Sequence, residues 1–186
     1  MKDQKQLLRK EIKVRMEKLS KRERIEKEHQ IYRNLFAMAK FKKSVHILSY
    51  VSFKNEVDTK YIIQRSIEEG KKVYVPRVDE DTNELKICAL SSFKELKKGY
   101  RGIPEPINEP VEKEKFDLIL VPGLAFDPNG FRLGRGEGYF DKYLDKVKGF
   151  KVGLGFFLQI VEKIPVEGHD IKMNMIITEK GFIESR

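Results

Sequence analysis

The sequence predicts an α/β domain with a three-layer, mainly parallel sheet flanked by helices, preceded by an N-terminal helical pair. Short apolar runs alternate with helical patterns from residue 44 onward, which is typical of such a sheet. The first 43 residues have only helical patterns. At 186 residues and 40% hydrophobic composition, the chain suits one core of ordinary size. We therefore expect a single domain over residues 1–186, with residues 1–43 packed on the α/β core.

The N-terminal pair is predicted from apolar spacing and a helix-start signal. One apolar stripe marks the first helix: Leu8, Ile12, Met16 and Leu19. Ser20 and Glu23 then match a capping box, in which the serine oxygen accepts from the Glu23 amide while Glu23 reaches back. The second helix is expected to bury one further set of side chains: Ile25, Tyr32, Leu35, Phe36 and Ala39.

Strands and helices alternate in the rest of the chain. We expect strands at residues 45–51, 73–75, 85–90, 116–121, 151–156 and 175–178, and helices from about residue 59 and at 139–147. Asp58 is the expected N-cap of the helix near residue 59, and Gly70 its C-terminal stop. Ligands of such sheets collect beyond the carboxyl ends of the strands. The segments after Val51 and Val121 are therefore the first places to look for a site.

All of the excess positive charge lies near the N-terminus. Residues 1–43 hold 15 Lys/Arg and 6 Asp/Glu, giving +9, whereas the other 143 residues hold 23 of each. Such a segment suits nucleic acid or small polyanions, or is simply a solvated helical face. A single cysteine, Cys88, excludes an internal disulfide, and no apolar run suits a membrane span or signal peptide, so we expect a cytoplasmic protein. No catalytic role is assigned to the histidines: His29, His46 and His169.

A segment rich in glycine and arginine carries the strongest chemical signal. Residues 123–141 read GLAFDPNGFRLGRGEGYFD and run into an expected helix. Glycines let the backbone approach a ligand closely, and a helix N-terminus offers unpaired N–H groups. Arg132 and Arg135 add planar forks that match phosphate oxygens. The combination favours phosphate binding over a loop of solvated arginines, although it is neither a Walker A loop nor a Rossmann fingerprint.

Three further features stay open on the residues alone. Asp141 suits Mg²⁺, which takes one or two carboxylates plus phosphate oxygens, and it equally suits a helix N-terminus. Lys5 and Arg9 share one helix face and can address one polyanion, but lysine-rich helices often produce this spacing by chance. Glu56 follows the first strand, where it can accept from amino or ring N–H groups or be a solvated loop residue.

Together these segments resemble the 5-formyltetrahydrofolate cyclo-ligase (methenyltetrahydrofolate synthetase) family. The strongest match is VPGLAFDPNGFRLGRGEGYFDKYL, residues 121–144, which is similar to the family signature PG-x-x-FD…G-x-RLGRG-x-GYYD. Shorter matches follow the expected order: KQLLR (5–9), NEVDT (55–59), VPR (75–77), GIPEP (102–106), Gln159, Pro165, His169-Asp170 and IIT (176–178). The resemblance therefore covers nearly the whole chain.

The resemblance implies a sheet of the ribose-5-phosphate isomerase and CoA-transferase type, and an enzyme that uses Mg-ATP to close 5-formyltetrahydrofolate into 5,10-methenyltetrahydrofolate. It implies that Lys5 and Arg9 contact the ATP phosphates, that Val51 and Glu56 hold the folate, and that Asp141 is associated with Mg²⁺. It implies a nucleotide-binding loop of nine residues: Arg132, Leu133, Gly134, Arg135, Gly136, Glu137, Gly138, Tyr139 and Phe140. The two arginines of that loop are the implied catalytic residues.

Four positions depart from the family pattern. Phe140 stands where a second tyrosine is usual, and Glu137 stands where Gly or Lys is common. Arg101 replaces an aromatic residue near the pterin, and Asn174 stands where Asp is frequent. None of these changes removes an essential charge.

Two alternatives remain at this point. A nucleic-acid-binding module would use the basic N-terminal helices, but it leaves residues 121–144 without a role. A different ATP-dependent enzyme of the same fold would keep the nucleotide site and change the substrate. We expect a monomer with small-molecule partners, ATP and a folate that can be polyglutamylated, and with neither nucleic acid nor membrane.

Overall fold

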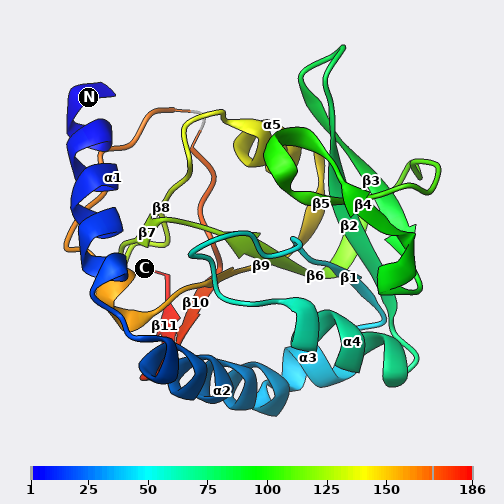
Figure 1. Cartoon of the computed structure of the whole chain (residues 1–186), viewed down its shortest axis with the longest axis horizontal. Helices are drawn as coiled ribbons and strands as arrows, with labels where there is room; N and C mark the ends of the chain where they lie inside the picture. Colours follow the sequence, from blue (N-terminus) through cyan, green and yellow to red (C-terminus); the bar gives the residue numbers. More distant parts are fainter. Residues whose placement is uncertain (1, 169, 186) are drawn as a thin grey trace.

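The computed structural model describes residues 2–168 and 170–185 and confirms the α/β layout (Figure 1). The helices are α1 (Lys2–Glu17), α2 (Lys21–Ala37), α3 (Ala39–Lys43), α4 (Lys60–Glu68) and α5 (Tyr139–Lys146). The central sheet contains β1 (His46–Leu48), β2 (Lys72–Asp79), β3 (Glu84–Leu90), β6 (Lys115–Pro122), β9 (Lys148–Leu154), β10 (Met175–Thr178) and β11 (Gly181–Glu184). Two small ribbons pair β4 (Leu96–Lys98) with β5 (Pro104–Pro106), and β7 (Ala125–Phe126) with β8 (Arg132–Leu133).

The sheet has the strand order β11-β10-β9-β6-β1-β2-β3. All neighbours from β10 to β2 are parallel, and the edge strands β3 and β11 pair antiparallel. From β1 the chain passes through α4 to β2 on one side, whereas from β6 it passes through α5 to β9 on the other. The boundary between β1 and β6 is therefore a topological switch point, where a crevice for ligands forms at the carboxyl ends of the strands.

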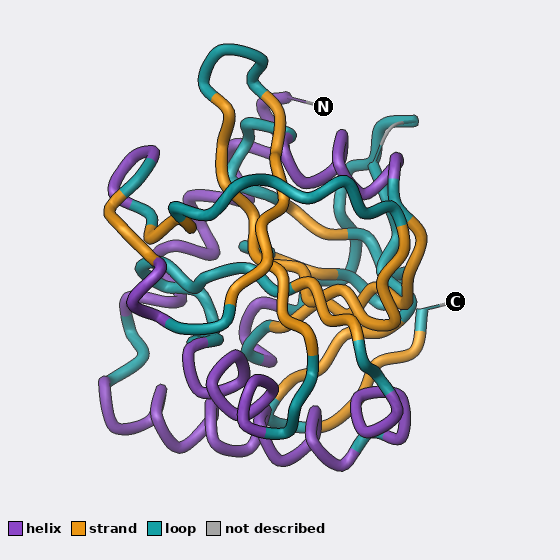
Figure 2. Tube along the Cα trace, turned by 90° about the vertical axis from the view of Figure 1, so that its right-hand side faces the viewer, coloured by secondary structure: helices purple, strands orange, loops and turns teal. Residues whose placement is uncertain are grey.

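Helices cover both faces of the sheet, so the predicted three layers are confirmed. Helices α2, α3 and α4 lie together on one face, and α5 lies on the other (Figure 1). Leu118 and Leu120 of β6 pack with the α2 and α3 side chains, whereas Ile119 and Val121 pack with Leu144 of α5. In Figure 2 the helices of the first face, α2, α3 and α4, lie along the lower side of the strands. Because the side chains on both faces of β6 are buried, its sequence is an almost continuous apolar run.

The N-terminal pair is confirmed as α1 and α2, but the burial of one residue and the end of α2 differ from the prediction. The capping box forms, since the Ser20 side chain accepts from the Glu23 amide and the Glu23 carboxylate accepts from the Ser20 amide. The prediction that Ile25 is buried is wrong, because its side chain is 43% exposed while Ile31 lies in the core. Ile25 lies on the same side of α2 as the buried Tyr32, seven residues further on, and this side also turns Glu28 toward the core. The second predicted stripe also ran too far, because α2 ends at Ala37 and residue 39 already belongs to α3.

Two boundaries around the first crossover differ from the prediction. The strand expected at 45–51 is shorter than predicted and consists of β1 alone, because the chain leaves the sheet after Leu48. The next residues fold over Tyr50, whose hydroxyl donates to the Val57 carbonyl. Thr59, not Asp58, occupies the N-cap position of α4, although the Asp58 carboxylate still accepts from the amide of the first helical residue.

Gly70 stops α4 as predicted. Its φ of +76° lies in the left-handed region that favours glycine. The Gly70 amide donates to the Ile67 carbonyl, and the Lys71 amide donates to the Ser66 carbonyl, which together make a Schellman motif. Within the two described ranges, no helix is long and apolar enough to cross a bilayer.

Candidate active site

A cleft of about 670 Å³ opens at the switch point. Its walls are the segment that follows β1, the segment that follows β6, the end of β2, and one face of α1. Every residue that the sequence singled out for binding or catalysis lines this cleft: Lys5, Arg9, Val51, Glu56 and residues 132–141. The structure thus brings together positions that lie more than a hundred residues apart in the chain.

Arg135 and Glu56 join the two walls of the cleft. Nε of Arg135 lies 3.0 Å from Oε1 of Glu56, and Nη2 of Arg135 donates to the Phe53 carbonyl at 2.9 Å. The other carboxylate oxygen of Glu56 accepts from the Phe53 amide at 2.9 Å. Burial raises the pKa of Glu56, and the neighbouring Arg135 acts against that rise. Glu56 is therefore a partly desolvated carboxylate held in one orientation at the cleft.

Arg132 is placed differently from Arg135. Its Nη2 lies 2.9 Å from Oδ1 of Asp141, with the two side chains 4% and 16% exposed. A second nitrogen, Nη1, donates to the Pro122 carbonyl at 3.4 Å, and the Phe140 ring centroid lies 5.7 Å from the guanidinium carbon. Burial lowers the pKa of Arg132, while Asp141 acts in the opposite direction. The fork of Arg132 thus anchors the start of α5 to the end of β6.

The glycine-rich loop turns sharply before α5. Gly136 has a φ of +113° and Gly138, at the N-cap position, a φ of +72°. Such backbone angles strain any residue with a side chain. Nε of Arg9 donates to the Gly134 carbonyl at 2.9 Å, and a side chain at Gly136 would meet the Arg9 guanidinium. Helix α1 therefore supports the loop through Arg9, which itself lines the cleft.

Lys5 enters the cleft with two acidic neighbours. Its Nζ lies 2.7 Å from Oδ2 of Asp170 and 3.0 Å from Oε2 of Glu167, and the lysine side chain is 12% exposed. The sequence assigned no role to Glu167. Glu167 and Asp170 lie more than 160 positions from Lys5 in the chain, so no motif spacing links them to it. Their acidic side chains are the only sequence feature that suits them as partners of a lysine. His169, quoted in the resemblance, lies outside the described residues.

A second pair of segments meets across the cleft mouth. Nη1 of Arg101 lies 2.6 Å from Oε1 of Glu137, and both side chains are largely exposed. Next to them the Tyr100 and Tyr139 rings meet edge to face with centroids 6.1 Å apart. Arg101 has a φ of 52°, an unusual value for a residue with a side chain. Two departures from the family pattern are therefore in contact with one another.

The cleft contains acidic side chains that bear on metal binding, among them Glu56, Asp141 and Asp170. Among residues 2–168 and 170–185, no group of three or more His, Cys, Asp or Glu side chains converges as a metal cage. Mg²⁺ that accompanies a nucleotide needs only one or two carboxylates, because phosphate oxygens and water complete its shell. Asp141, beside the glycine-rich loop, fits that requirement.

The chain is thus an α/β protein whose crevice, bridged by Arg135 and Glu56, lies at the switch point of a mainly parallel sheet, where proteins of this architecture bind their ligands. The model of the 5-formyltetrahydrofolate cyclo-ligase family matches residues 1–179 of this chain. The chain belongs to that family, and it is a cyclo-ligase.

Individual relatives agree with the family match. The 5-formyltetrahydrofolate cyclo-ligase of Mus musculus is 34% identical, with 92% of each chain covered. The Saccharomyces cerevisiae cyclo-ligase is 31% identical, covering 96% of this chain and 97% of the relative. The solved structure of Aquifex aeolicus 5,10-methenyltetrahydrofolate synthetase is 36% identical, with a TM-score of 0.87 over 98% of this chain and 93% of that one. A Mycoplasma pneumoniae synthetase shares the fold, with a TM-score of 0.76 at 23% identity over 94% of this chain and 98% of the other.

Proposed function

We propose that this chain closes 5-formyltetrahydrofolate into 5,10-methenyltetrahydrofolate with consumption of ATP and release of ADP and phosphate. Family membership supports this activity. The single observation that carries the assignment to this cleft is the contact of Arg135 with Glu56, which joins the glycine-rich loop to the segment after β1. A nucleotide bound by one wall and a folate bound by the other would have their reacting groups at this junction.

The nucleotide half is formed by the glycine-rich loop and α1. Gly136 and Gly138 expose backbone N–H groups beside the start of α5, where unpaired donors suit phosphate oxygens. Arg135 is 40% exposed, so its guanidinium can address a phosphate while it holds Glu56. Lys5 and Arg9 add charge from α1, and Lys5 would exchange its acidic partners for phosphate oxygens.

The folate half is formed by the segment after β1 and by the connection between β4 and β5. Val51 and Phe53 offer apolar surface, and Tyr100 and Ile103 face them across the cleft. Glu56 is the carboxylate at this end, and its acceptor oxygens match the amino and ring N–H donors of a pterin. A flat heterocycle with donors along one edge suits these walls.

The chemistry explains why positioning and charge dominate. The formyl oxygen attacks the γ-phosphorus, the bond to ADP breaks, and the N5 lone pair forms an iminium phosphate. N10 then attacks the iminium carbon, loses its proton, and phosphate leaves with the C–O bond electrons. Phosphoryl transfer of this kind asks the protein for alignment and for stabilisation of negative charge. We assign that stabilisation to Arg135 and, through its hold on the start of α5, to Arg132.

Asp141 is the residue that we propose to hold Mg²⁺. When bound, the ion would neutralise part of the negative charge of the phosphates. Arg132 already contacts one oxygen of Asp141, so it fixes the carboxylate at the base of the loop. Titration of the protein with Mg²⁺ and a non-hydrolysable ATP analogue tests this assignment. At equal folded fraction, Asp141→Asn should weaken analogue binding in Mg²⁺ and leave it unchanged in EDTA.

The proposed activity is tested by incubating the purified chain with Mg-ATP and 5-formyltetrahydrofolate and counting ADP released per methenyl product. A ratio of one is expected. Product without ADP, or ADP without product, would contradict the coupling. The monomeric state, the cytoplasmic location and any preference for polyglutamylated folate stay predictions, which sedimentation, cell fractionation and substrates of different tail length can test.

A further inference from the structure

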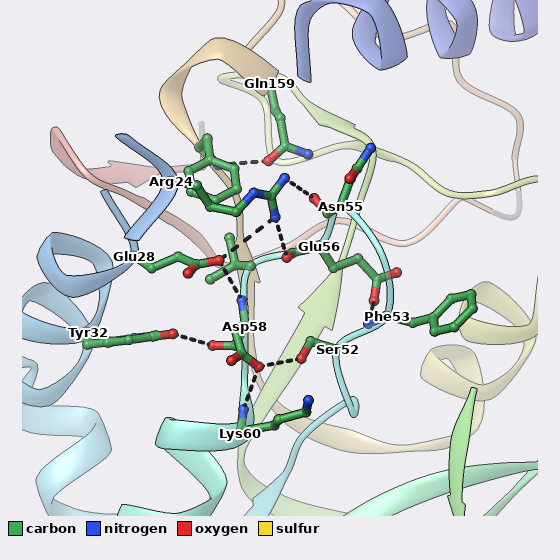
Figure 3. Close-up of polar contacts among 12 residues, drawn as sticks. Arg24, Glu28, Tyr32, Ser52, Phe53, Asn55, Glu56, Asp58, Lys60 and Gln159 are labelled. Atoms are coloured by element: carbon green, nitrogen blue, oxygen red, sulfur yellow. Dashed lines mark hydrogen bonds and ion pairs between the residues drawn. The ribbon is translucent and has the colours of Figure 1, made fainter. Parts of the chain in front are cut away.

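A buried polar network ties helix α2 to the segment that carries Glu56 (Figure 3). Nη1 of Arg24 donates to the Glu56 carbonyl at 3.2 Å, and Nη2 donates to the Asn55 carbonyl at 3.5 Å. The Arg24 side chain is 19% exposed. These contacts bind the backbone of residues 55 and 56 and leave the Glu56 carboxylate free to face the cleft. Arg24 was not singled out by any spacing or motif.

Neighbouring residues of α2 hold the next part of the same segment. Oε1 of Glu28 accepts from the Asp58 amide at 3.1 Å and lies 3.9 Å from Nη1 of Arg24. The Tyr32 hydroxyl donates to the Asp58 carbonyl at 2.8 Å. One face of α2 therefore holds residues 55–58 through hydrogen bonds to the backbone of residues 55, 56 and 58 (Figure 3). This also explains why the inward face of α2 contains a glutamate.

Arg24 also contacts the segment that follows β9. Its guanidinium carbon lies 5.1 Å from the centroid of the buried Phe156 ring. The Phe156 amide donates to Oε1 of Gln159 at 2.8 Å. Nε2 of Gln159 donates in turn to the carbonyls of Gly123 and Leu124, at 3.0 and 2.9 Å. Arg24 is thus connected to the start of the segment after β6, which leads to the glycine-rich loop.

We propose that Arg24 is a positioning residue for the reaction, which sets the Glu56 carboxylate against the wall that carries Arg135. This inference rests on the proposed function, in which Glu56 binds the folate. Arg24 acts through other groups, because its Nη1 and Nη2 donate to backbone carbonyls behind the Glu56 side chain. Misplacement of a binding group by about 1 Å can lower activity by roughly two orders of magnitude, so a residue behind the cleft can control it.

The test uses Arg24→Met, which keeps most of the apolar stem beside Phe156 and removes the donors. Arg22→Met is the matched control, because Arg22 lies on the same helix, is 89% exposed and pairs with Glu26. We expect kcat/KM for 5-formyltetrahydrofolate to fall about tenfold in Arg24→Met, with KM for ATP changed less than about twofold. Arg24→Lys, which keeps the charge and a single donor centre, should lie between wild type and Arg24→Met.

A double-mutant cycle with Glu56→Gln separates positioning from a general structural role. If Arg24 acts through Glu56, Arg24→Met should cause no further loss in the Glu56→Gln background. Additive losses, or equal effects on both substrates, would overturn the inference. Circular dichroism and thermal unfolding of each variant provide the folded fraction by which rates are corrected.

The cycle also distinguishes the two possible failures. A Glu56→Gln variant with wild-type kcat/KM for the folate would overturn the proposed role of Glu56, and with it this inference. A damaged Glu56→Gln beside a wild-type Arg24→Met would overturn the inference alone.

Discussion

Arg135 donates through Nε to the Glu56 carboxylate at 3.0 Å, although 79 positions separate the two residues in the chain. Glu56 follows β1 and Arg135 follows β6, the strands that flank the switch point of the sheet. The contact therefore fixes the two walls of the cleft relative to one another at the switch point. It also gives the partly buried carboxylate a counter-charge while leaving the arginine open to the cleft.

Arg135→Ala should lower kcat by roughly 100-fold, because a preorganised donor at a developing negative charge contributes on that scale. KM for the folate should rise by a smaller factor, since Glu56 loses its partner. Arg135→Lys should recover part of kcat, because the charge remains without the fork. Steady-state kinetics with each substrate varied in turn measure both constants. Unchanged kcat in Arg135→Ala would contradict the assigned role.

The activity should depend on the ionisation of Glu56. Burial raises the pKa of Glu56 above its ordinary value, so kcat/KM for the folate should fall as the pH drops through that raised pKa. Only the ionised carboxylate accepts from two donors of the pterin edge. The acid limb should disappear in Glu56→Gln, whose lower activity should be flat with pH. An acid limb that persists unchanged in Glu56→Gln would assign it to another group.

The same pKa shift has a consequence for stability. A carboxyl with a raised pKa in the folded state holds its proton more tightly there than in the unfolded chain. Its contribution to the free energy of unfolding is therefore lost as the pH rises from the unfolded pKa through the folded pKa. Urea unfolding above about pH 4, the ordinary glutamate region, should show less loss of stability with rising pH in Glu56→Gln than in wild type. A steeper loss in the variant would contradict the direction of the shift.

The buried pair of Arg132 and Asp141 should matter for folding as well as for binding. Asp141→Asn leaves a guanidinium that is 4% exposed without its counter-charge, which destabilises by about 3–5 kcal/mol. The double variant Arg132→Met with Asp141→Asn should regain most of that stability while remaining inactive. Chemical unfolding of the three proteins tests this. Losses that simply add would show that the two side chains do not act as a pair.

The packing around Phe126 should be intolerant of added volume. A Cβ atom at Gly153 would lie 2.4 Å from Cε1 of the buried Phe126 ring. Gly153→Ala should therefore destabilise by about 1–3 kcal/mol through overpacking, and Phe126→Leu should relieve much of it. Gly168→Ala is the control, since nothing lies within 4 Å of a Cβ there. Equal melting temperatures for the two alanine variants would contradict this account.

The long elements of the fold could be predicted because burial leaves a periodic signal. The apolar run at 116–121 became β6, and the run at 175–178 matches β10 residue for residue. The small ribbons could not be predicted, since strands of two or three residues have no period. Ile25 was misjudged because it lies seven residues before the buried Tyr32, on the same side of α2, and is nevertheless 43% exposed. Helical spacing shows which side of a helix is apolar but not how far along the helix the core extends.

The local part of the site could also be predicted. The glycine-rich loop and Glu56 were identified because each stands directly in a chemical motif or at a strand end. The contacts between the predicted residues could not be predicted, because the sequence of the loop does not reveal that the Arg132 guanidinium turns inward to Asp141. Arg24 could not be predicted either, since its hydrogen bonds to residues 55 and 56 go to backbone carbonyls, which carry no side-chain signal in the sequence.

The most direct test of the central claim is a spectroscopic assay of the purified protein with Mg-ATP and 5-formyltetrahydrofolate, following the near-ultraviolet band of the methenyl product. The band should grow only with ATP present and should grow far more slowly in Arg135→Ala of equal folded fraction. A band that never appears under these conditions, with nucleotide binding intact, would contradict the proposed substrate.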